Sequence, residues 1–194
     1  MRRLLMAWLA AALLGGCGVS EAPRFHATDI TGADYAKAFT LTDQHGRPRS
    51  LADFKGKVAT VFFGYTQCPD VCPTNLSTMA QVVKLLGADG DKLQVLFVTV
   101  DPERDTQQLL SEYMPAFHPT FIGLRGDAAV TEAVMKDFRV FAQKQGDVKG
   151  GTYTVDHTAG TYVYDPLGRL RLYVRHGETA ENIAADIRLL LQGK

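Results

Sequence analysis

Two long runs of β-branched and aromatic residues constrain the possible folds of this chain more than any other feature. They extend from Val58 to Phe63 and from Leu93 to Val100, and they are apolar or β-branched at almost every position. Such runs are typical of central strands with both faces covered. The segment between them begins at Pro73 and predicts an amphipathic helix, whose apolar face contains Leu76, Met79, Val82, Val83 and Leu86. Strand, helix and strand in this order favour a parallel pair joined by a crossover helix.

The remaining patterns extend this order to a complete domain over residues 36–194. We expect a hairpin over 39–51, a helix over 106–114, a strand over 121–124, a helix capped by Asp127 to about Phe141, a flexible glycine-containing excursion over 143–152, a hairpin of strands 161–164 and 170–174, and a helix capped by Thr179 to about Leu191. This order predicts an α/β, thioredoxin-like fold: a central mixed β-sheet flanked by helices, with an N-terminal hairpin.

The first 16 residues have the features of a signal peptide. Arg2 and Arg3 precede an apolar run from Leu4 to Leu14, and small residues follow. The run is shorter than the roughly 20 residues that span a bilayer, although an uncleaved anchor remains an alternative. Residues 14–17, Leu-Gly-Gly-Cys, resemble the lipobox of bacterial lipoproteins. This resemblance implies lipidation of Cys17, a linker over residues 17–35, and a protein anchored on the periplasmic side of the cell membrane.

The charge of the chain gives no sign of nucleic-acid binding. It has 21 basic and 21 acidic residues, and no long run of either sign.

The cysteines direct attention to one segment of the chain. If Cys17 carries lipid, only Cys68 and Cys72 of the three cysteines remain. They could form a disulfide outside the cytoplasm, but closing so small a loop stabilises little. Each is followed by proline, which favours a loop at the start of a helix and at the carboxyl end of a strand. A helix N-terminus favours thiolates, so we expect a site that binds a metal or exchanges electrons.

A copper ion held in both valences needs a further ligand, and an imidazole suits it. Of the five histidines, His157 is the best candidate because it directly precedes the strand predicted at Thr161. We expect surface or loop positions for the other four, which are His26, His45, His118 and His176. Asp101 follows a strand at the same end of the sheet, and either supports the metal site or caps a helix, a role that Asp105 could also fill.

Three segments carry a resemblance to the Sco/SenC family of copper-binding proteins that assemble cytochrome c oxidase. They are residues 64–74 (GYTQCPDVCPT), 100–106 (VDPERDT) and 155–158 (VDHT). The resemblance covers about residues 36–192. It implies a site for Cu(I) or Cu(II) formed by Cys68, Cys72 and His157, with Asp101 nearby. The partner implied is the binuclear copper site of cytochrome c oxidase subunit II, and other periplasmic copper carriers are possible partners.

The sequence leaves two functions open. A metallochaperone, which is not an enzyme, would carry one copper ion on the three ligands. A thiol–disulfide reductase would use the redox pair Cys68 and Cys72 to keep the copper-ligand cysteines of the oxidase reduced, with Cys68 as the attacking thiolate. Only the chaperone requires His157. A peroxidase is disfavoured because no basic residue lies between Lys57 and Lys84, although Arg104 could approach in space.

Overall fold

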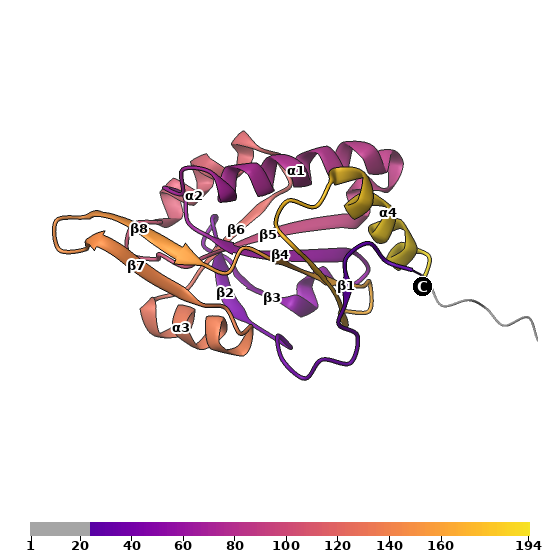
Figure 1. Cartoon of the computed structure of the whole chain (residues 1–194), viewed down its shortest axis with the longest axis horizontal. Coiled ribbons are helices and arrows are strands. Elements are labelled where there is room, and N and C mark those ends of the chain that lie inside the picture. The colour runs from indigo at the N-terminus through magenta and orange to yellow at the C-terminus, as the bar shows by residue number, and fades with distance from the viewer. Residues whose placement is uncertain (1–23) are drawn as a thin grey trace, which may run out of the picture.

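The computed structural model describes residues 24–194, which form one mixed sheet covered by helices and extended by a projecting hairpin (Figure 1). The predicted signal peptide and Cys17 lie outside these residues. The strands of the main sheet are ordered β1-β10-β9-β4-β5-β6-β2-β3. Their bounds are β1 Thr28–Asp29, β2 Thr40–Asp43, β3 Pro48–Ser50, β4 Val58–Gly64, β5 Leu93–Thr99, β6 Ile122–Arg125, β9 Thr161–Tyr164 and β10 Leu170–Val174. The helices are α1 Val71–Leu86, α2 Gln107–Tyr113, α3 Ala128–Asp137 and α4 Ala180–Leu191.

The two apolar runs form the centre of the sheet, as predicted. Every residue of β4 and β5 is buried, and the two strands pair in parallel from Val58 opposite Leu93 to Gly64 opposite Thr99. Strand β6 continues the parallel arrangement, whereas β9 pairs with β4 in the antiparallel direction. The sheet is therefore mixed and has the thioredoxin-like plan expected from the sequence.

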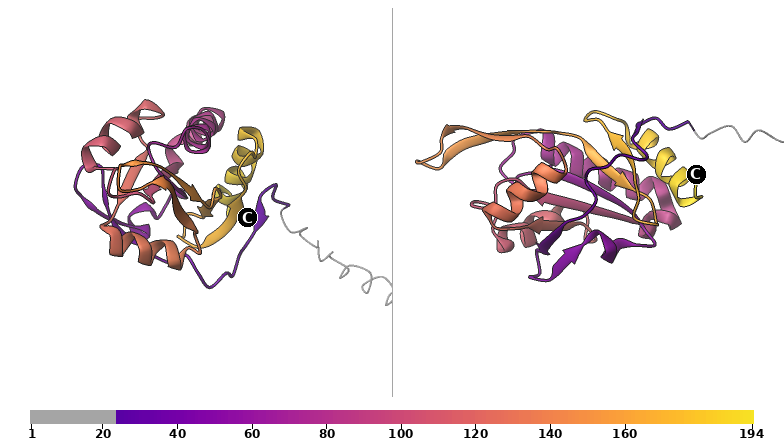
Figure 2. Two further views of the ribbon diagram at one scale, coloured as in Figure 1. Left: turned by 60° about the vertical axis from the view of Figure 1, so that its left-hand side comes forward. Right: turned by 90° about the horizontal axis from the view of Figure 1, so that it is seen from below.

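Helices cover both faces of this sheet. Helices α1, α2 and α4 lie on one face and α3 lies on the other (Figures 1 and 2). The glycines of the central strands identify the first face. A Cβ at Gly64 would meet Cys72 of α1, and a Cβ at Gly123 would meet Leu110 of α2. The carboxyl ends of β4 and β5 thus open beside the N-terminus of α1.

The predicted flexible excursion over residues 143–152 is wrong. Residues Ala142–Asp147 form β7 and Thr152–His157 form β8, an antiparallel pair that projects from the body of the molecule (Figure 1). The pattern hid β7 because this strand is polar and largely exposed, so it lacks the hydrophobic alternation of a half-buried strand. Strand β8 does alternate, with Tyr153 and Val155 buried. Helix α3 also ends at Asp137, four residues before the predicted end, and Arg139 follows with a positive φ of 54°.

The predicted linker over residues 17–35 is also wrong for residues 26–29, which pack on the domain. Strand β1 pairs with β10 at the sheet edge, and the backbone N–H groups of His26 and Ala27 donate to the Asp186 carboxylate of α4. These bonds were invisible in the sequence because they join residues about 160 positions apart. Among residues 24–194, no helix is both long and apolar enough to cross a membrane.

Candidate metal centre

The two cysteines lie where β4 gives way to α1. Strand β4 ends at Gly64, a loop carries the half-buried Cys68, and α1 begins at Val71. Cys72 therefore occupies the first turn of the helix and is fully buried, whereas the sequence placed both cysteines in the loop. Pro73 is accommodated because the N–H groups of the first turn have no partner within the helix. Both cysteines are free thiols.

His157 is the last residue of β8, and its side chain lies next to the cysteines. Its Nε2 lies 3.4 Å from the Sγ of Cys72. Its Nδ1 lies 3.1 Å from the carbonyl oxygen of Thr158, and because a carbonyl can only accept, Nδ1 is the protonated nitrogen. The lone pair of Nε2 is therefore free and directed at the sulfur. The imidazole is held edge-on to the rings of Phe62 and Tyr65, at centroid distances of 6.0 and 5.9 Å.

Together these side chains form a compact donor set. The Sγ atoms of Cys68 and Cys72 and a ring nitrogen of His157 all lie within 4.8 Å of one another. Within residues 24–194 this is the only cluster of three or more potential metal ligands of the His, Cys, Asp and Glu types. A trigonal ion with metal–ligand bonds of about 2.0–2.3 Å needs donors about 4 Å apart. The three groups thus require a movement of less than about 1 Å to enclose one soft cation.

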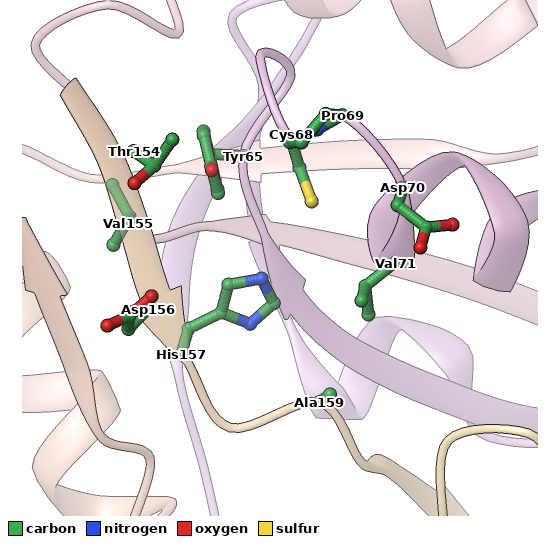
Figure 3. Close-up of a pocket in the computed structure, with 10 residues that line it drawn as sticks. All are labelled: Tyr65, Cys68, Pro69, Asp70, Val71, Thr154, Val155, Asp156, His157 and Ala159. Carbon is green, nitrogen blue, oxygen red and sulfur yellow. The ribbon is translucent and has the colours of Figure 1, made fainter. Parts of the chain in front are cut away.

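Two of the three donors, Cys68 and His157, border an open pocket. Its walls come from the cysteine loop on one side and from β8 on the other, with His157 and Cys68 pointing toward each other across it (Figure 3). An ion at this position would therefore be reachable from solvent.

Burial determines the protonation states of Cys72 and His157. It raises the pKa of the Cys72 thiol well above its ordinary value, and the nearby Cys68 and Asp105 add to this. The expectation that the helix N-terminus would make both sulfurs thiolates is therefore wrong for Cys72 in the metal-free protein, since the cost of burying a charge exceeds the effect of the helix dipole. Burial also lowers the pKa of His157 below 6.5, which keeps its imidazole neutral and able to bind a cation.

Asp101 is fully buried beside the site but is too far from it to join the donor cluster. Its carboxylate accepts a hydrogen bond from the Tyr153 hydroxyl at 2.9 Å and forms an ion pair with Arg104. The Arg104 guanidinium stacks on the Tyr153 ring at 3.5 Å and donates to the Tyr153 carbonyl at 2.8 Å. It also donates to the side-chain oxygen of Gln67, next to Cys68. Asp101 and Arg104 thereby connect the cysteine loop to the strand that carries His157.

Asp105 has a role in the site that the sequence did not reveal. It is not the helix cap, because Thr106 caps α2 by accepting from the backbone N–H of Leu109. Its buried carboxylate accepts instead from the backbone N–H and hydroxyl of Thr66 and from the hydroxyl of Thr99. Burial raises the pKa of Asp105 despite these bonds. These hydrogen bonds connect the loop before α1 to the end of β5.

The remaining histidines lie apart from the donor cluster. His118 bonds to the hydroxyl of Thr120 through Nδ1, and His26, His45 and His176 are outside every group of metal-ligating residues among those described.

Comparison with known proteins places the whole domain in one family. Residues 27–192 match the SCO1/SenC family model. The chain is 36% identical over 196 residues to the mitochondrial SCO2 homologue of Bos taurus, covering 96% of this chain and 74% of the bovine protein. It is 37% identical over 152 residues to the corresponding Mus musculus protein, covering 77% of this chain and 60% of the mouse protein.

Solved structures agree with the sequence comparison. The structure of ScoI from Bradyrhizobium japonicum with copper bound has a TM-score of 0.73 and 43% identity, covering 79% of this chain and 98% of that one. Yeast Sco1 with copper bound has a TM-score of 0.74 and 31% identity, covering 81% and 88% of the two chains. Because the family model matches residues 27–192 and these relatives are more than 30% identical over most of the chain, this chain belongs to the SCO1/SenC family.

Proposed function

We propose that this protein binds one copper ion through the Sγ atoms of Cys68 and Cys72 and the Nε2 atom of His157. The convergence of these three donors within 4.8 Å carries the proposal. Two sulfurs and one imidazole form a soft donor set of the kind that copper prefers. With both thiols deprotonated, a Cu(I) complex has a net charge of −1, and an added oxygen ligand would suit Cu(II). Copper-bound structures of two family members support this assignment.

We propose further that the ion is cargo, which the protein delivers to the binuclear copper site of cytochrome c oxidase subunit II. Only three protein ligands hold the ion, and the pocket that Cys68 and His157 border is open. A closed structural site would instead have four protein ligands. Family membership supports the oxidase as recipient, since one solved relative is described as a member of the Sco family of cytochrome c oxidase assembly proteins.

Anaerobic titration of the reduced protein with copper tests the ligand set. We expect one equivalent to bind and Cu(II) to give thiolate charge-transfer absorption. Cys68→Ser, Cys72→Ser and His157→Ala should each reduce affinity by at least 100-fold while the domain stays folded, because each removes one of three bonds. His118→Ala is the matched control and should bind normally. Stoichiometric, tight binding by either serine variant would exclude this ligand set.

A thiol–disulfide reductase is the second candidate, and the unequal exposure of the cysteines favours it. Cys68 is half-buried beside the open pocket, whereas Cys72 is fully buried, which is the arrangement of an attacking and a resolving thiol. The reduction of a model disulfide peptide by wild type and His157→Ala separates the two roles. Equal rates combined with lost copper affinity would assign reduction to the cysteine pair alone.

We propose that residues 1–16 direct export and that a lipid on Cys17 anchors the protein at the periplasmic side of the cell membrane, with the domain following the anchor. The lipobox-like residues 14–17 support this. Cys17→Ser should release the protein from the membrane fraction, whereas unchanged fractionation would indicate an uncleaved apolar anchor.

A further inference from the structure

One side-chain nitrogen bridges the two walls of the pocket between the cysteine loop and β8. The Nη1 of Arg104 donates to the side-chain oxygen of Gln67 at 3.1 Å and to the backbone carbonyl of Tyr153 at 2.8 Å. Gln67 directly precedes Cys68 in the cysteine loop, and Tyr153 belongs to β8, the strand that ends at His157. Arg104 therefore bonds to both of the segments whose separation sets the distance between the cysteine loop and the imidazole.

The β7–β8 hairpin depends on side chains for its attachment to the body of the molecule. Among residues 24–194 its two strands form a separate sheet and pair with each other, not with the main sheet. The Tyr153 hydroxyl donates to Asp101, and the Arg104 guanidinium covers the Tyr153 ring at 3.5 Å. Lys144 of β7 forms an ion pair with Glu103 at 2.7 Å. All of these polar contacts end on the segment that follows β5, so this segment holds the hairpin in its direction.

The direction of β8 determines where the imidazole lies. Burial alternates along this strand, and Tyr153, Val155 and His157 share its inward face. A strand extends by about 3.4 Å per residue, so about 13 Å separates Tyr153 from His157. Over that length a tilt of about 5° about Tyr153 would displace the imidazole by about 1 Å. The attachment at Tyr153 therefore has to be tight if the three donors are to stay close together.

The attachment needs a guanidinium. The Nε of Arg104 pairs with the fully buried Asp101 carboxylate while Nη1 forms the bridge, and a lysine has a single nitrogen for both tasks. The Arg104 side chain is only 14% exposed, and its Nη2 is buried without a hydrogen-bond partner among the described residues. A buried ion pair stabilises a fold little compared with apolar side chains, and an unpaired N–H is unfavourable. Stability alone does not account for this arginine.

We propose that Arg104 is a positioning residue for copper, which holds β8 against the cysteine loop so that the His157 imidazole already lies beside the sulfurs when the ion arrives. This inference rests on the proposed copper function. A guanidinium stays protonated and forms no bond to the ion. Its effect is preorganisation, which reduces the cost of bringing the donors together and so increases both copper affinity and the fraction of copper that carries the imidazole.

Arg104→Lys tests the proposal, because it keeps the positive charge beside Asp101 and removes the bridge. We expect Cu(I) affinity to fall by about 10- to 100-fold. The nitrogen hyperfine coupling of the imidazole in the Cu(II) electron paramagnetic resonance spectrum should weaken. In a His157→Ala background the same substitution should leave affinity unchanged, since no imidazole remains to be positioned.

Arg125→Lys is the matched control. Arg125 donates to the backbone carbonyls of Pro102 and Asp105, so its bonds end within the same segment after β5. Its replacement should leave both copper measurements unchanged. If Arg104→Lys does not fold, Gln67→Ala replaces it: this exposed side chain is the acceptor on the cysteine loop, and its loss should lower affinity in the wild-type background but not in His157→Ala.

Unchanged affinity and hyperfine coupling in Arg104→Lys, with wild-type copper binding intact, would overturn this inference alone. Equal losses of affinity in the wild-type and His157→Ala backgrounds would also overturn it, because Arg104 would then act on the fold or the cysteines and not on the imidazole. A wild-type protein that binds no copper, or a His157→Ala variant that binds it as tightly as wild type, would overturn the proposed function as well.

Discussion

Gly64 restricts the position of the Cys72 sulfur through close packing. A Cβ at this position would lie 2.7 Å from the Sγ of Cys72 and 2.8 Å from the Phe97 ring, which is closer than real Cβ contacts allow. Gly64→Ala should therefore displace Cys72, lower the free energy of unfolding by about 1–3 kcal/mol and weaken copper binding. Urea unfolding and copper titration measure the two effects.

Gly123→Ala provides the control for this prediction. Its Cβ would meet Met114 at 2.9 Å on the same face of the sheet, but two strands away from Gly64. It should destabilise the protein to a similar extent and leave copper affinity unchanged. If both variants lose affinity equally, general loosening of the core, rather than displacement of one sulfur, explains the effect.

The three residues of the donor cluster could be singled out from the sequence because few side chains bind a soft cation. The sequence contains an isolated pair of cysteines and one histidine before a buried strand, and these restricted the choice of candidate metal ligands. Gly64 and Asp105 could not be identified in this way, since their roles depend on atoms brought near them by folding. A glycine in a strand and an acidic residue before a helix have ordinary local explanations. Only in the folded protein does Gly64 pack against the Cys72 sulfur and Asp105 accept from the hydroxyls of Thr66 and Thr99.

At the level of the element, the β2–β3 and β9–β10 hairpins are stabilised by the same arrangement of one aspartate and two arginines. Asp43 in the β2–β3 turn accepts from the side chains of Arg47 and Arg49, and Asp165 in the β9–β10 turn accepts in the same way from Arg169 and Arg171. The spacing is identical in both: an aspartate, then glycine three residues later, then arginines at four and six residues. Each aspartate also caps backbone N–H groups within its own turn.

The free energy of unfolding should depend on pH through Asp43 of the β2–β3 hairpin. Burial opposes ionisation of Asp43, but bonds from Arg47, Arg49 and His45 outweigh it and lower the pKa from 3.8 to about 2. Because the folded-state pKa is depressed, the contribution is complete above pH 3.8 and disappears as the pH falls through about 2. This shift corresponds to about 2 kcal/mol. Asp43→Asn should therefore destabilise by about that amount at pH 7 and by much less near pH 2.

Urea unfolding at both pH values checks this prediction. Asp91→Asn, which changes an exposed carboxylate, should unfold like wild type throughout. A penalty for Asp43→Asn that is the same at pH 2 as at pH 7 would show that the ionised carboxylate is not its source.

The elements were predictable wherever apolar residues repeat with a clear period, as in β4, β5 and α4. The β7–β8 hairpin was not, because its stability comes from bonds between its own strands and from the contacts of Tyr153 with Asp101 and Arg104. Neither leaves a hydrophobic pattern in β7. The one strand that delivers the imidazole was thus partly hidden from sequence analysis.

For the whole molecule, the domain should begin before residue 36. Strand β1 pairs at the sheet edge, and the Asp186 carboxylate, which is only 2% exposed, accepts from the N–H groups of His26 and Ala27. The family model likewise matches from residue 27. A protein starting at residue 36 would leave this buried carboxylate unpaired, at a cost of about 1–3 kcal/mol.

We expect its melting temperature to be lower by on the order of 5 °C than that of a protein starting at residue 24. Scanning calorimetry of the two copper-free proteins makes the comparison, and the longer one serves as the reference. Equal melting temperatures would show that residues 24–35 behave as the linker predicted from the sequence.

The distance along the chain between the ligands determines when the protein can acquire its metal. Cys72 and His157 are 85 residues apart in the sequence. Their side chains come together only after the sheet has formed and Arg104 has bonded to both Gln67 and Tyr153. In an unfolded chain such a separation leaves the imidazole at a low effective concentration near the sulfurs. If the chain is exported unfolded, as proposed above, it reaches its compartment without a formed donor cluster, and copper loading has to follow folding there.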